Sequence, residues 1–144
     1  MPTINRSALL PYTARQVYDL VNDVESYPSF MEGCIGARII SRSEHAMEAR
    51  LELSRGGIVH SFTTLNTLVA NEAIELRLRE GPFERFAGCW RFKALGEAAC
   101  KVSLELDFKI RNALVGVAAG HLFERVTNSQ VEAVARRARQ VYGA

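Results

Sequence analysis

Apolar residues recur at every second position over most of the middle of the chain, from Ile35 to Ile110. The run 100–110 is the clearest, because apolar residues occupy its even-numbered positions and polar residues its odd-numbered ones. Two shorter runs, 47–53 and 74–78, alternate in the same way. Turn-forming residues separate the runs at 55–57, 70–72, 81–82 and 96–97. The pattern predicts consecutive antiparallel strands with one apolar and one polar face.

Helical spacing begins after a predicted first strand over residues 3–9. Thr13 and Gln16 have the spacing of a capping box, so a helix is predicted to begin beside them. Its apolar residues are spaced to form one buried face. A very short second helix is predicted next, with Ser26 as its N-cap and Pro28 in its first turn.

A long helix is predicted near the end of the chain, from the N-cap candidate Asn112 to about Tyr142. At about 1.5 Å per residue its length is roughly 45 Å. Its apolar residues form one stripe, which comprises Val115, Ala119, Leu122, Val126, Ala133 and Val141.

These elements predict an α+β protein in β-α-α-β6-α order, with residues 1–144 forming one domain. A curved antiparallel sheet of about seven strands would be wrapped on the long C-terminal helix. Such a sheet need not close tightly on a single helix. We therefore expect a cavity for a ligand between them.

Composition narrows the class of protein further. The chain has 144 residues, of which 48% are hydrophobic and 24% charged, as is ordinary for a globular domain. The net charge of +2 is too small to indicate a nucleic-acid binder by itself, and we expect no DNA partner. Three cysteines, an odd number, favour free thiols in a reducing compartment. With no signal peptide or apolar span in the sequence, we expect a cytoplasmic protein.

A search for catalytic motifs finds none. His45, His60 and His121 lie far apart, and no metal-binding spacing joins them, so no metal site is predicted. No nucleophile elbow and no phosphate-binding loop occur. Arg136, Arg137 and Arg139 near the C-terminus suit the helix dipole, and a solvated helix end is the simplest interpretation.

Two segments carry apolar residues that allow two interpretations each. Tyr27, Phe30 and Met31 lie in a short segment interrupted by Pro28, so they either cap the core or form a lid over a cavity. In the aromatic run 83–92, Gly88 lies between residues that point to the same side of the sheet. It marks either a bend or bulge in a packed core, or a gap in a cavity wall.

These segments also carry a family resemblance that covers essentially the whole chain. The stretches VYDLVNDVESYPSFMEGC, FTTLNTL, GPFERFAGCWRF, LDFKI and the final VYGA resemble the coenzyme Q-binding START-domain family, within the START/SRPBCC superfamily that also holds polyketide cyclases. The first and third stretches are the most specific. The chain departs from the family pattern at Glu32, where members usually carry a proline.

The resemblance implies a helix-grip fold, START- or Bet v 1-like, with a tunnel for a lipid or an isoprenoid quinone. It implies no catalytic residues, no metal and no required cofactor, although a ubiquinone or another lipid would occupy the tunnel. Carried onto this chain, the implied cavity residues are Tyr27, Phe30, Met31, Phe62, Phe83, Phe86, Trp90, Leu104, Leu106, Phe108, Val115, Leu122, Phe123 and Val126.

Three functions follow as hypotheses. The first is non-enzymatic binding of ubiquinone or another prenyl lipid in support of respiration, with transient contact at the surface of the inner membrane. The second is suggested by the bacterial ribosome-association toxins of the family: binding to the large ribosomal subunit, which blocks subunit joining. The third is a polyketide cyclase or aromatase. It ranks last, because Thr64 and Asn66 are the only obvious polar residues predicted to face inward.

Overall fold

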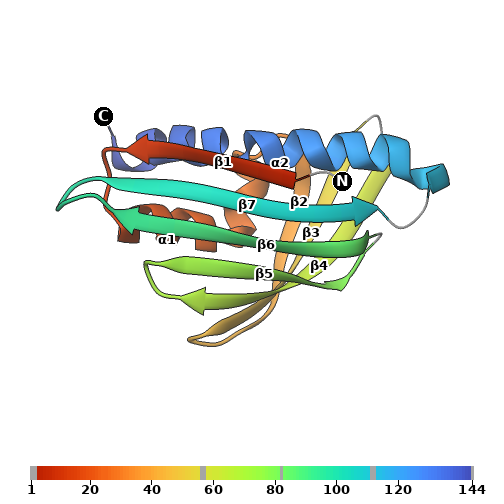
Figure 1. Cartoon of the computed structure of the whole chain (residues 1–144), viewed down its shortest axis with the longest axis horizontal. Coiled ribbons are helices and arrows are strands. Elements are labelled where there is room, and N and C mark those ends of the chain that lie inside the picture. The colour runs from red at the N-terminus through yellow and green to blue at the C-terminus, as the bar shows by residue number, and fades with distance from the viewer. Residues whose placement is uncertain (1–2, 56–57, 82, 111–112, 144) are drawn as a thin grey trace.

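The computed structural model describes residues 3–55, 58–81, 83–110 and 113–143, without the side chains of 55, 58, 110 and 113–123. The predicted β-α-α-β6-α order is confirmed (Figure 1). In chain order the elements are β1 (Thr3–Leu10), α1 (Ala14–Asn22), the 3-10 helix η1 (Val24–Ser29), β2 (Cys34–Arg42), β3 (Ala46–Arg55), β4 (Ile58–Val69), β5 (Ala73–Glu80), β6 (Phe83–Ala94), β7 (Cys100–Ile110) and α2 (Ala113–Tyr142).

The strands form one seven-stranded antiparallel sheet in the order β1-β7-β6-β5-β4-β3-β2. Strands β2 to β7 follow one another as a meander, as predicted from the alternating runs. The first strand then pairs with the last one, so β1 and β2 form the two edges. Figure 1 shows β2, β3 and β4 crossing the direction of the other strands, which makes the sheet strongly curved.

The inner face of the sheet carries the apolar residues that the alternation predicted. Met47 pairs with Asn66 and Leu51 with Phe62, so the inward positions of β3 and β4 meet across the ladder. On β6 and β7, Trp90 pairs with Leu104 and is buried with it. The core therefore lies on one side of the sheet, and the charged residues of the same strands lie on the other.

The first helix begins as predicted. The Gln16 backbone amide donates a hydrogen bond to Thr13 Oγ1 at 3.1 Å, and the Thr13 backbone amide donates to Gln16 Oε1 at 2.8 Å.

The prediction for the start of the second helix was wrong, because η1 begins at Val24. The Ser26 hydroxyl does not cap it and donates instead to Asp23 Oδ2 at 2.6 Å.

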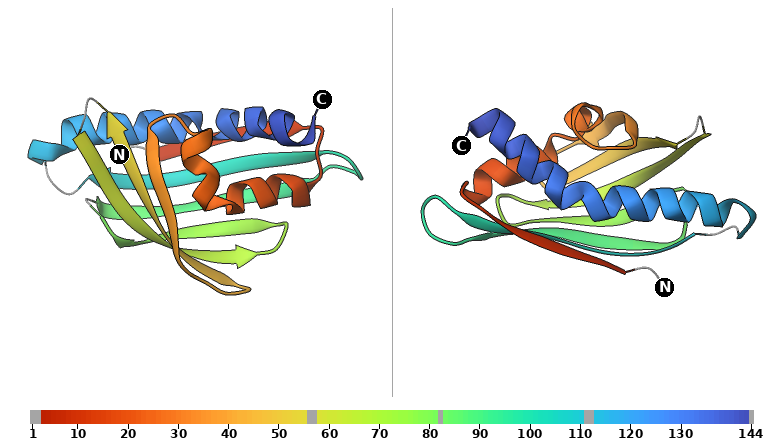
Figure 2. Two further views of the ribbon diagram at one scale, coloured as in Figure 1. Left: turned by 180° about the vertical axis from the view of Figure 1, so that it is seen from behind. Right: turned by 90° about the horizontal axis from the view of Figure 1, so that it is seen from above.

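Helix α2 covers the inner face of the sheet, with α1 and η1 beside it (Figure 2). Its buried stripe includes Val126 and Ala133, as predicted, but not Val141, which is 49% exposed. The fully buried part of the stripe ends at Ala138, and in the next turn Tyr142 packs, half-buried, against the core. Asn112, the predicted N-cap, lies outside the described residues. Within the described part of the chain, no helix is long and apolar enough to cross a membrane.

Gly88 marks a close approach of β6 and β7, and it does not open a gap. A Cβ atom at this position would lie 2.5 Å from Leu106 Cδ1 and 2.9 Å from the Glu105 carbonyl oxygen. The Leu106 side chain thus occupies the space in front of the glycine. The structure therefore supports the packed core and not the gap, but the ladder runs through Gly88 in regular register, so the predicted bulge is absent at this position.

Candidate ligand-binding cavity

An apolar cavity of about 50 Å³ lies between the inner face of the sheet, η1 and α2. Strands β3 to β7 supply most of its wall, and α2 supplies the opposite side. The lining residues are Tyr27, Leu51, Leu53, Phe62, Thr64, Leu76, Phe86, Trp90, Leu104, Leu106, Val126, Thr127 and Gln130. Pockets that hold small organic ligands typically have roughly 300–1,000 Å³. The cavity is therefore too small in this structure to hold a prenylated ligand unless it widens.

Few polar groups face this cavity. The Thr127 hydroxyl donates a hydrogen bond to the Glu124 carbonyl at 3.1 Å, within its own helix. The Gln130 amide lies 3.5 Å from Met31 Sδ, and a thioether is a weak acceptor. Thr64 on β4 completes the set on the sheet side. These neutral groups can orient the head of an apolar ligand, and no cation or carboxylate belongs to the described lining.

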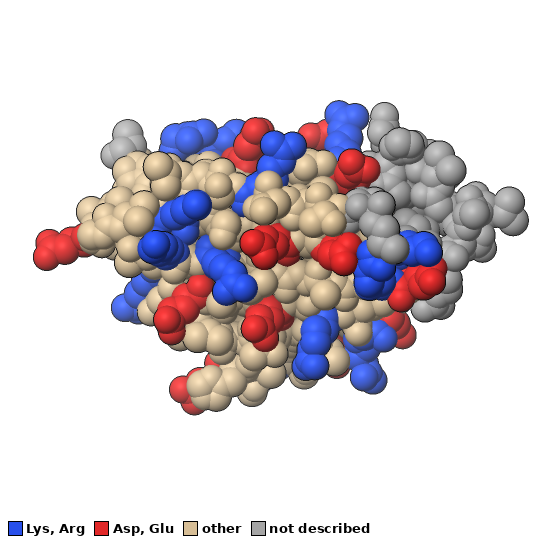
Figure 3. Space-filling view, viewed as in Figure 1, with Lys and Arg blue, Asp and Glu red and all other residues tan. Residues whose placement is uncertain are grey.

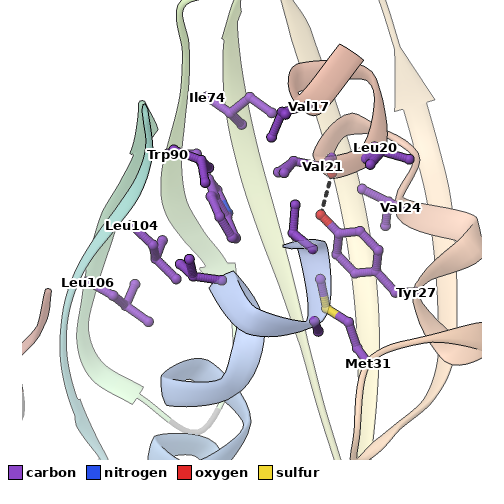
Figure 4. Packing of buried hydrophobic residues seen from close by; sticks show 14 of the residues in the cluster. Val17, Leu20, Val21, Val24, Tyr27, Met31, Ile74, Trp90, Leu104 and Leu106 are labelled. Carbon is purple, nitrogen blue, oxygen red and sulfur yellow. Dashed lines mark hydrogen bonds between the residues drawn. The ribbon is translucent and has the colours of Figure 1, made fainter. Parts of the chain in front are cut away.

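Tyr27 is the lining residue with the most acidic proton, and the structure holds that proton in place. Its hydroxyl donates to the Val21 carbonyl, as the dashed line in Figure 4 shows. Burial raises the pKa of Tyr27, and the nearby Cys34 and Asp23 raise it further. The phenol is therefore a neutral structural donor that fixes η1 to α1. It is unsuited to act as a general acid or base near neutral pH.

The thiols show no sign of activation. Burial raises the pKa of Cys34, Cys89 and Cys100, which keeps each one in the protonated, weakly nucleophilic form. Cys100 is fully buried, as its place in the alternation predicted. Across the described ranges, no three His, Cys, Asp or Glu side chains are grouped so that they could hold a metal ion.

The segment after η1 lies on α2 along a line that we call the η1–α2 seam, formed by residues 30–32 with Arg125, Gln130 and Arg137. The Arg137 guanidinium lies 5.3 Å from the centre of the Phe30 ring, and Arg125 Nη2 lies 3.2 Å from Glu32 Oε1. Glu32, the departure from the family pattern, thus has a defined partner. Exposed contacts of these kinds contribute about 1 kcal/mol or less each.

The predicted cavity residues separate into four groups. Those that line the cavity are Tyr27, Phe62, Phe86, Trp90, Leu104, Leu106 and Val126. Phe83 and Phe108 are buried in the aromatic cluster beside it, and Phe30 and Met31 lie at the seam. Val115, Leu122 and Phe123 have side chains outside the described residues. Contact of any of these residues with a ligand stays a prediction.

Several lining residues were absent from the predicted set. Leu51, Leu53 and Leu76 carried a usable signal, because the alternating runs already placed them on the inner face. Thr127 and Gln130 carried none, because polar residues on an amphipathic helix usually face solvent. Figure 4 shows how Tyr27 and Met31 approach the same region as Trp90 and Leu104 from the opposite side.

A curved antiparallel sheet, gripped by a long C-terminal helix over an apolar cavity, defines the helix-grip class of ligand-binding folds. The sequence profile of the family described as "Polyketide cyclase / dehydrase and lipid transport" matches residues 10–135. The chain belongs to this family. The resemblance to the START/SRPBCC superfamily is thereby confirmed.

Comparison with individual proteins adds detail. Ribosome association toxin RatA of Escherichia coli strain K12 is 43% identical over 144 residues, which are 100% of this chain and 91% of that protein. RatA of Pseudomonas aeruginosa is 46% identical over 140 residues, 97% of each chain. Coenzyme Q-binding protein COQ10 homolog B, mitochondrial, of Xenopus laevis is 22% identical over 143 residues, 96% of this chain and 59% of that protein.

A solved structure supports the fold. The crystal structure of the Zhui aromatase/cyclase from Streptomyces sp. R1128 superposes with a TM-score of 0.84, covering 97% of this chain and 95% of that one. The two sequences are 20% identical. The likeness thus confirms the predicted helix-grip fold and carries no further information about activity.

Replacing Tyr27 tests the role of its hydroxyl. We expect Tyr27→Phe to lower the free energy of unfolding at pH 7 by about 1–3 kcal/mol, because the buried Val21 carbonyl loses its donor. The pKa of Tyr27 is raised on folding, so its contribution is complete below its unfolded pKa of about 10 and declines as the pH rises above that value. In Tyr27→Phe, which has no phenol at this position, the free energy of unfolding should fall less steeply above about pH 10 than in the unmodified protein. Urea unfolding between pH 7 and 11 measures both effects.

The matched control is Tyr142→Phe, whose hydroxyl donates to the Gln16 carbonyl at 2.9 Å from a half-buried position. It should cost less at pH 7 than Tyr27→Phe. An equal cost for the two variants, or an unchanged pH profile in Tyr27→Phe, would contradict the structural role assigned to Tyr27.

Proposed function

We propose that this protein binds the large ribosomal subunit in the cytoplasm and blocks its joining to the small subunit. The observation that carries the proposal is identity of 43% and 46% with two ribosome association toxins over nearly the whole of each chain. The COQ10 relative is half as similar and is matched over 59% of its length. The order of the first two hypotheses is therefore reversed, and ribosome binding becomes the leading function.

The proposed action requires no catalysis, and the cavity is consistent with that. Its described lining is apolar apart from Thr64, Thr127, Gln130 and the phenol of Tyr27. A cyclase needs groups that gain and lose protons near neutral pH, and none of these four does so readily. The family includes cyclases by its description, but the residues of this cavity support binding better than acid–base chemistry.

A subunit-joining experiment tests the leading proposal. Purified small and large subunits are mixed at a magnesium concentration that favours whole ribosomes, with and without the protein, and separated on sucrose gradients. We expect the whole-ribosome peak to fall as protein is added and the protein to sediment with free large subunits. An unchanged profile with the protein at the top of the gradient would contradict the proposal.

A second function is favoured by a separate observation, the apolar cavity itself. We propose that it takes up a prenylated quinone, such as ubiquinone, or a similar lipid with a neutral head group. The lipid would be collected by transient contact with the inner membrane, in support of respiration. The ring would approach Thr127 and Gln130, and the prenyl chain would lie against the aromatic wall.

The free energy of opening the η1–α2 seam can be compared with the free energy that a ligand supplies. The two exposed contacts, Arg125–Glu32 and Arg137–Phe30, contribute about 2 kcal/mol at most, and exposing the buried Met31 side chain costs about 1.5–3 kcal/mol more. Burial of about 300 Å² of prenyl chain would yield about 7 kcal/mol at ~25 cal/mol per Å², which exceeds that cost. Separation of the seam is therefore the proposed route of entry, with Phe30 and Met31 moving away from α2.

Trp90 offers a direct measurement of uptake, because it is the single tryptophan of the chain and it lines the cavity. We expect short-chain ubiquinone to quench its fluorescence with saturation. Val126→Phe fills the cavity and should weaken this binding at least tenfold, since Val126 belongs to the lining. Val141→Phe, at a position that is 49% exposed, is the matched control and should bind as the unmodified protein does.

Circular dichroism verifies that both variants are folded, because overpacking a core can cost about 1–3 kcal/mol. Absence of saturable quenching in the unmodified protein would contradict quinone binding. Equal quenching in Val126→Phe would place the ligand elsewhere.

A further inference from the structure

Four cations on the outer face of the sheet have an acidic partner on another strand, with nitrogen–oxygen distances from 3.0 to 3.8 Å. Arg85–Asp107 and Lys109–Glu84 join the adjacent strands β6 and β7. Arg79–Glu48 and Arg50–Glu80 join β5 and β3, which lie on either side of β4. The two pairs on β6 and β7 are the expected arrangement, since opposite charges on adjacent strands stabilise a sheet.

The other end of β6 and β7 breaks this rule. Lys93 and Lys101 lie directly opposite each other in the register of the two strands. Like charges in this position destabilise a sheet. Both side chains are exposed, and neither has an acidic partner within 4.0 Å among the described residues. Arg91, two residues before Lys93, is exposed on the same face. We call these three residues the hairpin basic cluster.

The hairpin basic cluster is bordered by acidic residues on one side and by exposed apolar residues on the other. Glu75 and Glu105 both pair in register with Cys89, one step beyond Arg91, so Arg91 lies at the border with the acidic part of the face. Past that border, Leu9 is the β1 partner of Lys101 and is 71% exposed. Leu95, just after β6, is 44% exposed. The two lysines thus stand on an open surface with exposed apolar neighbours.

The C-terminal end of α2 adds more positive charge at this end of the molecule. Leu10 pairs with Cys100, and Tyr12 then reaches α2, where its ring centre lies 5.8 Å from that of Tyr142. Arg136 and Arg139 are exposed on this last part of the helix. Figure 3 shows several basic side chains over the start of β7 and over the C-terminal end of α2, with acidic groups beside them. One acidic residue near the lysines is Glu97, which is exposed in the turn between β6 and β7.

We propose that the hairpin basic cluster, together with Arg136 and Arg139, binds the phosphate backbone of ribosomal RNA on the large subunit. The inference rests on the proposed function and adds the surface through which it acts. A phosphate placed between Lys93 and Lys101 neutralises both and removes their repulsion, and binding releases the counterions of the RNA. Phosphate contacts of this kind position a protein without reading sequence.

Charge and position favour RNA over a lipid membrane as the partner. The cluster lies on the outer face of the sheet, whereas the cavity and the η1–α2 seam lie on the inner side. A membrane contact that served lipid uptake would be expected beside the seam. The like-charged pair costs stability in the free protein, and a bound polyanion is the chemistry that compensates for it.

The test compares two double variants that each remove two positive charges from the outer face. Lys93→Gln/Lys101→Gln alters the cluster, and Arg79→Gln/Lys109→Gln is the matched control at cations that already have acidic partners. Affinity for purified large subunits is measured by co-sedimentation at several KCl concentrations. We expect the cluster variant to bind at least tenfold more weakly at 100 mM KCl, with the slope of log K against log salt reduced by about 2. The control should change less than twofold.

The outcomes separate this inference from the function on which it rests. If the unmodified protein fails to sediment with large subunits, the proposed function is wrong. If it binds and the cluster variant binds equally well with the same salt slope, the surface is wrong while the function stands.

Equal losses of affinity in both variants would show a non-specific charge effect and overturn the inference. So would a cluster variant that binds subunits normally but loses binding to phosphatidylglycerol vesicles. Thermal unfolding verifies folding, and relief of the lysine repulsion should leave the cluster variant no less stable than the control.

Discussion

The structure depends on one geometric constraint: a single helix must cover the inner face of a seven-stranded curved sheet. Val126, Val131, Val134 and Ala138 bury one stripe of α2 for this purpose, while α1 and η1 cover the area beside it. One helix is too narrow to fill the whole concavity of such a sheet. The small apolar cavity is the space that remains, and its wall is made of the side chains that would otherwise touch the helix. The covering of a curved sheet by a single helix therefore accounts for the fold, the core and the candidate ligand site together.

Because the core lies on one side of the sheet only, the two faces can serve different partners. The cavity on the inner side is lined by apolar side chains and three neutral polar ones, apart from the phenol that holds η1 in place. On β6 and β7 the outer face offers charge, paired with acidic groups at one end and without such partners at the lysine end. A protein of this class can thus gain a macromolecular partner through its outer face without disturbing the interior. That separation allows similarity to ribosome association toxins and an apolar cavity to coexist in one chain.

Much of this fold could be predicted from the sequence, because alternation and capping are local patterns. The capping box at Thr13 and the inward positions of β3 to β7 were predicted correctly for that reason. Two predictions were wrong: Ser26 as the N-cap of the second helix, and Val141 as part of the buried stripe of α2. Both depend on where neighbouring elements end, which local patterns do not show. Thr127 and Gln130 were absent from the predicted cavity, since helix polarity does not show which side chains meet an inner space. The opposition of Lys93 and Lys101 depends on strand register across a hairpin turn, which periodicity leaves undetermined.

The central claim is that the chain meets the ribosome through the hairpin basic cluster on the outer face of the sheet and the C-terminal end of α2. Hydrogen–deuterium exchange tests it most directly, with the full chain measured alone and bound to purified large subunits. The account predicts slower exchange on binding in residues 93–101 and 136–143, with exchange in residues 24–33 unchanged. Slower exchange in residues 24–33 with none in 93–101 would contradict it, because contact would then be made through the η1–α2 seam.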